Sequence, residues 1–196
     1  MHPELISLSL FMFATSCSPG PNNIVASYSG FNFGVLKTIP HMLGVIFGFT
    51  TLVSLMNFGL INIFQKFPII QEILKYTGSI FLIYLAYKIS FSKNSSDNTA
   101  KNPVRFIETF FFQFINPKSV IVSVIMVSTY VHNGKDFLFH SFWVIGVAFL
   151  FAVISINFWT FLGKFLRRFA SNEKFIKRFN YVMSFLLLTC IATFYY

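Results

Sequence analysis

The sequence predicts an all-α membrane protein with six transmembrane helices, arranged as two inverted three-helix repeats in which helices 1 and 4 are broken. Composition is the first reason, because 55% of the residues are hydrophobic and 11% are charged, whereas a soluble domain carries about 25% charged residues. Length is the second, because 196 residues accommodate about six spans of roughly 20 residues. The third is that prolines interrupt two of the apolar runs.

Polar turns separate six apolar runs. A polar segment at the middle of the chain, residues 93–103, has no apolar periodicity and is expected to be a solvated linker between repeat halves 1–92 and 104–196. The whole chain is expected to form a single integral membrane domain. In order, the expected spans cover about residues 5–28, 37–64, 69–91, 106–131, 137–162 and 179–196.

The first span is broken at the sequence Ser18-Pro19-Gly20-Pro21-Asn22-Asn23. Proline removes a backbone donor, and lipid offers no new partner for the freed carbonyl groups. Such a break is tolerated where it lines a cavity, as in secondary transporters. Pro21 suits the first position of a new helix, so the free amides near Asn22 and Asn23 favour an anion such as a carboxylate. The alternative is a structural kink with capping asparagines.

The fourth span is interrupted at Asn116-Pro117-Lys118. A lysine inside a span needs a partner or water, so Lys118 is expected to hold a substrate carboxylate or to neutralise Glu108. The alternative is that Lys118 extends to the membrane interface. Gln113 lies one helical turn before Asn116 and faces the same way. The predicted substrate-binding set is Pro19, Gly20, Pro21, Asn22, Asn23, Gln113, Asn116, Pro117 and Lys118.

The two breaks also suggest an internal repeat. Pro19 and Pro117 are 98 positions apart, as are Gly48 and Gly146. Each half contains three spans, an odd number, so the halves have opposite orientation in the membrane, as in inverted-repeat transporters.

Five other polar residues are candidates for a coupling group or a transport path. Glu108 is the only carboxylate near the predicted midplane path, which favours proton coupling. His41 could relay protons or mark an interface. Asn57 and Asn157 are expected chiefly to form interhelical hydrogen bonds, and Tyr84 could line the path or mark an interface.

Three glycines in the first half are assigned to helix packing. Gly44 and Gly48 form a Gly-x-x-x-Gly pair in the second span, which lets two helix backbones approach closely. Gly34, in the preceding turn, is grouped with them.

Basic residues predict the orientation. Eleven Lys and Arg side chains fall in or near the loops after spans 1, 3 and 5, and three fall on the opposite side. The positive-inside rule therefore places the first group in the cytoplasm and both termini in the periplasm. The same clustering between apolar runs excludes nucleic acid as the reason for the net charge of +9.

Several motifs resemble the LysE/RhtB family of amino-acid exporters. They are Ser18-Pro19-Gly20-Pro21-Asn22-Asn23, Gly34 with the segment Pro40–Phe49, the segment Ile83–Lys88, and the segment Phe112–Lys118. The resemblance covers essentially the whole chain. It implies a bacterial inner-membrane exporter of small amino acids or their derivatives, driven by the proton gradient, and it leaves the cargo open.

Two other functions stay open at this stage. Related membrane architectures carry a proline-flanked cysteine in each half and relay electrons between thiols. Cys17 fits one half of that pattern, but Cys190 lies on the last span. Export of a metal or small ion is the other alternative, although the breaks lack clustered carboxylate, His or thiolate ligands. No enzymatic motif is present and no cofactor is expected; the expected partners are an amino acid, protons and lipid, and a homo-oligomer stays open.

Overall fold

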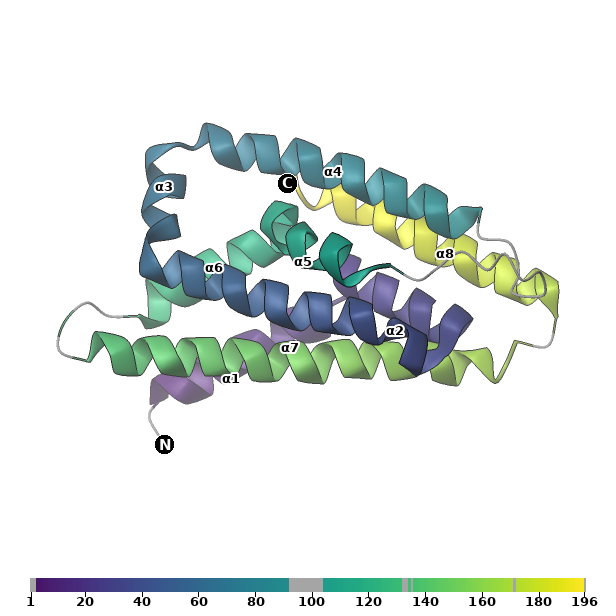
Figure 1. Cartoon of the computed structure of the whole chain (residues 1–196), viewed down its shortest axis with the longest axis horizontal. Helices are drawn as coiled ribbons and strands as arrows, with labels where there is room; N and C mark the ends of the chain where they lie inside the picture. The colour runs from purple at the N-terminus through teal and green to yellow at the C-terminus, as the bar shows by residue number, and fades with distance from the viewer. Residues whose placement is uncertain (1–2, 92–103, 132–133, 135, 171, 196) are drawn as a thin grey trace.

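The computed structural model describes residues 3–91, 104–131, 134, 136–170 and 172–195, and the predicted linker 93–103 lies outside these ranges. Within them the chain is helical and contains no strand. Figure 1 shows the N-terminus at one end of the molecule and the C-terminus about midway along its long axis. The elements are α1 (Pro3–Cys17), α2 (Pro21–Leu55), a π-helical turn η1 (Met56–Leu60), α3 (Ile61–Lys66), α4 (Ile69–Ser90), α5 (Phe106–Ile115), α6 (Pro117–Tyr130), α7 (Phe137–Arg167) and α8 (Glu173–Ala192).

Both helix breaks lie where the prolines predict them. α1 ends before the first break and α2 begins with Pro21 at its first position; α5 ends before Asn116 and α6 begins with Pro117. The axes of α5 and α6 differ in direction by 62°. Pro21 and Pro117 each open a helix, whereas Pro19, which the predicted repeat pairs with Pro117, lies before α2.

The chain reverses direction at Gly34, inside α2. Gly34 has φ 79° and ψ 173°, a conformation that glycine adopts without steric cost. His41 Nε2 lies 3.2 Å from the carbonyl oxygen of Asn22, whereas 19 residues of straight helix would span about 28 Å. α2 therefore consists of two arms folded against each other, residues 21–33 and 35–55. A Cβ on Gly34 would meet no atom within 4 Å, so this glycine serves the turn and not the packing role predicted for it.

Four helical segments are long and apolar enough to cross a membrane: Pro21–Phe64, Ile69–Ser90, Phe137–Arg167 and Glu173–Ala192. The bent pair α5 and α6 makes a fifth if it is counted as one broken span, and α1 is a shorter apolar helix. These counts, which refer to the described residues, identify a multi-pass membrane protein. The six-span repeat stays a prediction.

Small residues bring the first arm of α2 against α7. A Cβ added to Gly30 would lie 2.1 Å from the Thr160 carbonyl oxygen of α7. In the reverse direction, a Cβ on Gly163 would lie 2.0 Å from the Ser27 carbonyl oxygen of α2. Such distances leave no room for a side chain, so the backbones approach as closely as two helices can.

The second arm of α2 packs against α5 in the same way. A Cβ on Gly44 would lie 2.7 Å from the carbonyl oxygen of Phe106, and one on Gly48 would lie 2.7 Å from that of Phe110. Gly44 and Gly48 thus bring α2 close to the helix that leads into the second break.

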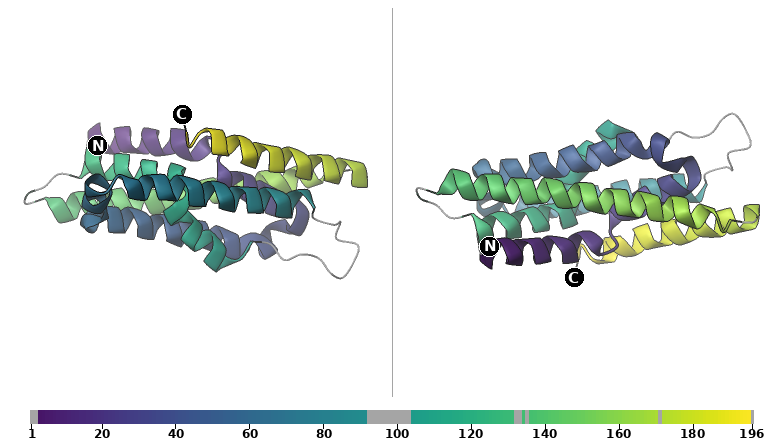
Figure 2. Two further views of the ribbon diagram at one scale, coloured as in Figure 1. Left: turned by 90° about the horizontal axis from the view of Figure 1, so that it is seen from above. Right: turned by 90° about the horizontal axis from the view of Figure 1, so that it is seen from below.

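α4 and α8 lie side by side, as the views in Figures 1 and 2 show. Ser184 donates a hydrogen bond of 2.8 Å to the Ala86 carbonyl oxygen, and Ser90 donates one of 2.7 Å to the Ser184 hydroxyl. These bonds join the last helices of the two halves.

Candidate functional site

A cavity of about 80 Å³ lies between the two helix breaks. It is far smaller than the pockets of drug-sized ligands, which measure about 300–1,000 Å³, so it suits a small solute. Its apolar lining residues are Met12, Val45, Phe49, Val122, Ala152 and Ile156. The rest of the lining carries most of the polar groups and consists of Thr15, Ser16, Gly20, Pro21, Asn22, Asn23, Asn116, Lys118, Ser119 and Ser155.

Six of the nine residues predicted to bind substrate line this cavity, and they come from both breaks. The other three lie beside it in the chain or behind its wall. Pro19 lies in the first break, Pro117 opens α6, and the fully buried Gln113 supports Asn22 from behind.

Lys118 reaches across from the second break to the first. Its Nζ donates hydrogen bonds to the Ser18 hydroxyl, at 2.7 Å, and to the Ser18 carbonyl oxygen, at 3.2 Å. Gly20 makes space for this side chain, because a Cβ there would lie 2.9 Å from Nζ. The ammonium group is therefore held beside the cavity. Lys118 does not contact Glu108 as one prediction proposed.

Asn22 and Gln113 form a reciprocal amide pair between the two halves. The Asn22 Nδ2 donates to Gln113 Oε1 at 2.8 Å, and the Gln113 Nε2 donates to Asn22 Oδ1 at 3.1 Å. Gln113 also donates to the Thr109 carbonyl oxygen and accepts from the Ser119 hydroxyl. Since Gln113 is fully buried, this pair fixes the orientation of the Asn22 side chain at the cavity wall.

His41 extends this polar network away from the cavity. It is buried, with Nδ1 2.9 Å from the Thr109 hydroxyl and Nε2 3.2 Å from the Asn22 carbonyl oxygen. The His41 ring is thus surrounded by protein and not exposed to lipid or water, and its interfacial position stays a prediction. Its role as a proton relay stays a prediction.

Asn23 closes the end of α1. Its Nδ2 donates to the carbonyl oxygens of Ser16, at 2.8 Å, and Ser18, at 3.1 Å. Ser155, from α7, donates to the same Ser16 oxygen at 2.9 Å. Carbonyl groups at the end of a helix lack partners within it, so Asn23 and Ser155 supply them, and Asn23 acts here as the capping asparagine of the kink interpretation.

The polar groups that line the cavity favour a negatively charged ligand. At the start of α6 the Asn116 side chain accepts a bond from the Lys118 backbone N–H at 3.2 Å. At the start of α2, Gly20 offers no side-chain cap. The first N–H groups of α2 are therefore left for a ligand or water, beside the Lys118 ammonium. An ammonium and a helix N-terminus both favour an anionic group.

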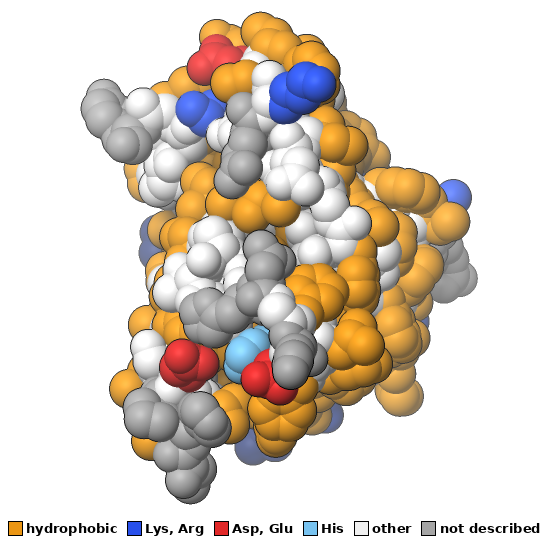
Figure 3. Space-filling model, turned by 90° about the vertical axis from the view of Figure 1, so that its left-hand side faces the viewer, with side chains coloured by type: hydrophobic (Ala, Val, Ile, Leu, Met, Phe, Trp, Pro, Cys, Tyr) orange, Lys and Arg blue, Asp and Glu red, His pale blue; other side chains and the backbone are white. Residues whose placement is uncertain are grey.

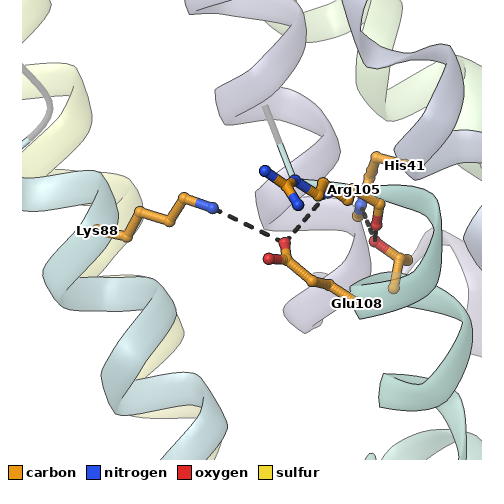
Figure 4. A network of polar contacts seen from close by, with 5 residues as sticks. His41, Lys88, Arg105 and Glu108 are labelled. Carbon is orange, nitrogen blue, oxygen red and sulfur yellow. Dashed lines mark hydrogen bonds and ion pairs between the residues drawn. The ribbon is translucent and has the colours of Figure 1, made fainter. Parts of the chain in front are cut away.

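Glu108 lies at the start of α5. Its Oε2 accepts a bond of 3.1 Å from the Arg105 backbone N–H and lies 3.8 Å from Lys88 Nζ. Figure 4 shows this pair, with His41 on the other side of the α5 start. Glu108 is thus paired with Lys88 and not with Lys118. Proton coupling by Glu108 stays a prediction.

Comparison with known proteins identifies the family. A family model described as LysE type translocator matches residues 13–196. The chain belongs to the LysE family. Its relatives include proteins named cysteine/O-acetylserine efflux protein from Escherichia coli K12, 29% identical, and from Salmonella typhimurium LT2, 28% identical, each aligned over 100% of both chains. No solved structure matches the chain.

None of the five predicted path residues lines the cavity of this LysE protein; His41 and Glu108 are described above. Asn157 donates to the Val153 carbonyl oxygen of its own helix, and among the described residues it forms no interhelical bond of the kind expected of it. Asn57 is buried in η1, and neither side-chain polar atom has a partner among the described residues. Tyr84 is 48% exposed on α4, with Lys88 Nζ 5.9 Å from its ring centroid.

Sequence reasoning missed several residues of this candidate site. Ser119 and Ser155 line the cavity, and Thr109 links His41 to the backbone of α5. Their common signal is a small hydroxyl side chain inside an apolar span. That signal is weak, because most such hydroxyls bond to their own helix backbone.

Proposed function

We propose that this LysE-family protein is a secondary transporter that exports small amino acids or their derivatives, of the cysteine or O-acetylserine type, across the bacterial inner membrane. The observation that carries the proposal is the contact between Lys118 and Ser18 at a cavity lined by both helix breaks. A secondary transporter binds its solute between two structural halves that move relative to each other. Family membership and the names of the relatives support export as the direction of transport.

The mixture of polar and apolar residues that line the cavity supports an amino acid as the cargo. In this proposal the substrate carboxylate binds between Lys118 and the start of α2, where positive charge is concentrated. The small side chain of the cargo contacts apolar lining residues such as Phe49 and Ala152. The volume of about 80 Å³ favours a short side chain over an aromatic one.

Proton coupling is part of the proposal. His41 and Glu108 lie near the start of α5, and the buried network from His41 through the Asn22 backbone reaches the cavity wall. Protonation changes at such a network would alter the contact between the halves. In this proposal the end of the molecule that carries most Lys and Arg faces the cytoplasm and the N-terminus faces the periplasm.

Efflux from proteoliposomes loaded with a labelled mixture of amino acids tests the proposal, under an imposed proton gradient. We expect selective loss of one or a few small amino acids. Lys118→Met should slow it about 10- to 100-fold, because it removes charged hydrogen bonds of about 1.5–3 kcal/mol. Asn22→Ala should also slow it.

Asn157→Ala is the matched control, since its side chain bonds to its own helix away from the cavity. This variant should export at nearly the normal rate. Efflux from the wild-type vesicles no faster than from protein-free vesicles would overturn the proposal and direct attention to the ion or redox alternatives.

A further inference from the structure

Six basic side chains gather where α7 ends and α8 begins. All six are exposed, and Glu173 is the one acidic residue within this stretch. The ion pair found in the described chain joins Lys88 to Glu108, so these six have no carboxylate partner there. We call them the basic collar: Lys164, Arg167, Arg168, Lys174, Lys177 and Arg178.

Aromatic rings support and interleave the basic collar. The Arg167 guanidinium lies 5.4 Å from the ring centroid of Phe31. Phe31 is itself buried and stacked on Phe179, with 3.8 Å between ring centroids. Arg168 lies 6.0 Å from the ring centroid of Phe165, which is 50% exposed. Two of the six charged groups, those of Arg167 and Arg168, thus lie over phenylalanine rings at the end of an apolar span.

The basic collar lies at one end of the molecule, which determines what it can contact. Both views of Figure 2 place the end of α7 and the start of α8 together at one end of the molecule. The opposite end, seen in Figure 3, shows acidic and basic side chains in the same view among hydrophobic ones. The collar end combines six basic side chains that lack a carboxylate partner among the described residues with Phe165 and Phe169, which are 50% and 60% exposed. At the opposite end, Lys66 Nζ lies 5.8 Å from the ring centroid of Phe67, which is 49% exposed, so the collar end differs in the number of its charges.

We propose that the basic collar binds the phosphate groups of anionic phospholipids at the membrane surface. Lys and Arg side chains pair with headgroup phosphates, while the exposed phenylalanine rings lie among the adjoining acyl chains. Basic clusters next to transmembrane helices attract anionic lipid by about fivefold in binding for each charge. Nucleic acid would use the charges but leave the exposed rings without an apolar partner. This binding is separate from the export function.

Native mass spectrometry of the full-length protein in detergent tests the proposal. Phosphatidylglycerol and phosphatidylcholine are added in parallel, and bound lipid is counted for each protein. We expect preferential binding of phosphatidylglycerol to the wild type. Lys174→Gln with Lys177→Gln should weaken that binding roughly 25-fold, from about fivefold for each charge removed. Both positions lie in the first turns of α8, where a positive charge is unfavourable to the helix, so the substitutions should not unfold it.

The control is Lys66→Gln with Lys75→Gln, which removes the same charge at the opposite end. It should leave phosphatidylglycerol binding within about twofold of the wild type. Equal binding of the two lipids, or equal loss in the two double variants, would overturn the proposal. So would displacement of the lipid by an equimolar DNA duplex or by equimolar inorganic phosphate. Because binding is measured without transport, a failure of the export proposal would leave this result unchanged.

Discussion

At the scale of single residues, the polar groups of the two breaks satisfy one another across the two halves of the chain. Lys118 binds Ser18, and Asn22 binds Gln113. Each contact joins residues about half the chain apart. A substrate that competes for Lys118 or Asn22 would therefore change how firmly the halves are held together, which is the physical link between binding and movement in this site.

The Asn22–Gln113 pair predicts non-additive effects of mutation. Asn22→Ala removes both bonds of the pair but leaves Gln113 bonded to Thr109 and Ser119. Gln113→Ala removes the Asn22 amide's partner, and each change should cost about 1–3 kcal/mol of stability. The double variant should be less destabilised than the sum of the two by about 0.5–3 kcal/mol. Thermal unfolding of the purified protein measures the cycle. Additive effects, within about 0.3 kcal/mol, would show that the two amides act independently.

Substitution of the two cysteines distinguishes the exporter proposal from the thiol-redox alternative. Cys17 and Cys190 are free thiols, and neither lines the cavity. We expect Cys17→Ser with Cys190→Ser to export within about twofold of the wild-type rate, because serine is close in size to cysteine. Efflux assays on vesicles containing equal amounts of protein measure this. Complete loss of function with normal folding would favour the redox relay instead.

At the scale of helices, close approach of backbones organises the bundle. α2 contacts α7 through Gly30 and Gly163 and contacts α5 through Gly44 and Gly48. The same long segment of the first half therefore touches two helices of the second half, one of which, α5, leads into the second break. We expect α2 to transmit a movement of the chain at one break to the other break.

Glycine substitutions in α7 test this packing. Gly163→Ala places a Cβ 2.0 Å from the Ser27 carbonyl oxygen, and a backbone atom cannot move aside cheaply. We expect a loss of about 1–3 kcal/mol, seen as a Tm lower by about 2–4 °C for each kcal/mol.

Gly146 provides the control in the same helix. A Cβ there would meet no atom within 4 Å, so Gly146→Ala should be neutral or stabilise by up to about 1 kcal/mol. Equal Tm values for the Gly163 and Gly146 variants would show that α2 and α7 can separate without cost. Gly146 and Gly48, which the predicted repeat pairs, also differ in their surroundings. A Cβ at Gly146 would meet no atom within 4 Å, whereas Gly48 is tightly packed against α5.

At the scale of the whole molecule, orientation in the membrane can be tested directly. Lys66→Cys and Lys174→Cys, each made with Cys17→Ser and Cys190→Ser, place one thiol near each end of the molecule. The charge asymmetry predicts that a membrane-impermeant maleimide labels the first in intact cells. It should label the second only after permeabilisation. The reverse pattern would place the termini in the cytoplasm.

Local backbone chemistry is what the sequence by itself determined. The positions of both breaks, the proline at the start of each new helix and the turn near Gly34 follow from residues that act on their immediate neighbours. The hydropathy of the apolar runs likewise identified a membrane protein, because a sufficiently long apolar helix is more stable in lipid than in water. Two of the family motifs, Ser18–Asn23 and Phe112–Lys118, contain these breaks.

Only the tertiary structure decided which polar groups meet. The amide pair of Asn22 and Gln113, the reach of Lys118 to Ser18 rather than Glu108, and the burial of His41 depend on which helix faces come together. Asn57 and Asn157 were indistinguishable from such residues by sequence, since each is an asparagine within an apolar run. Partners far apart in the chain are chosen by packing of whole helices, and a pattern within one helix cannot specify them.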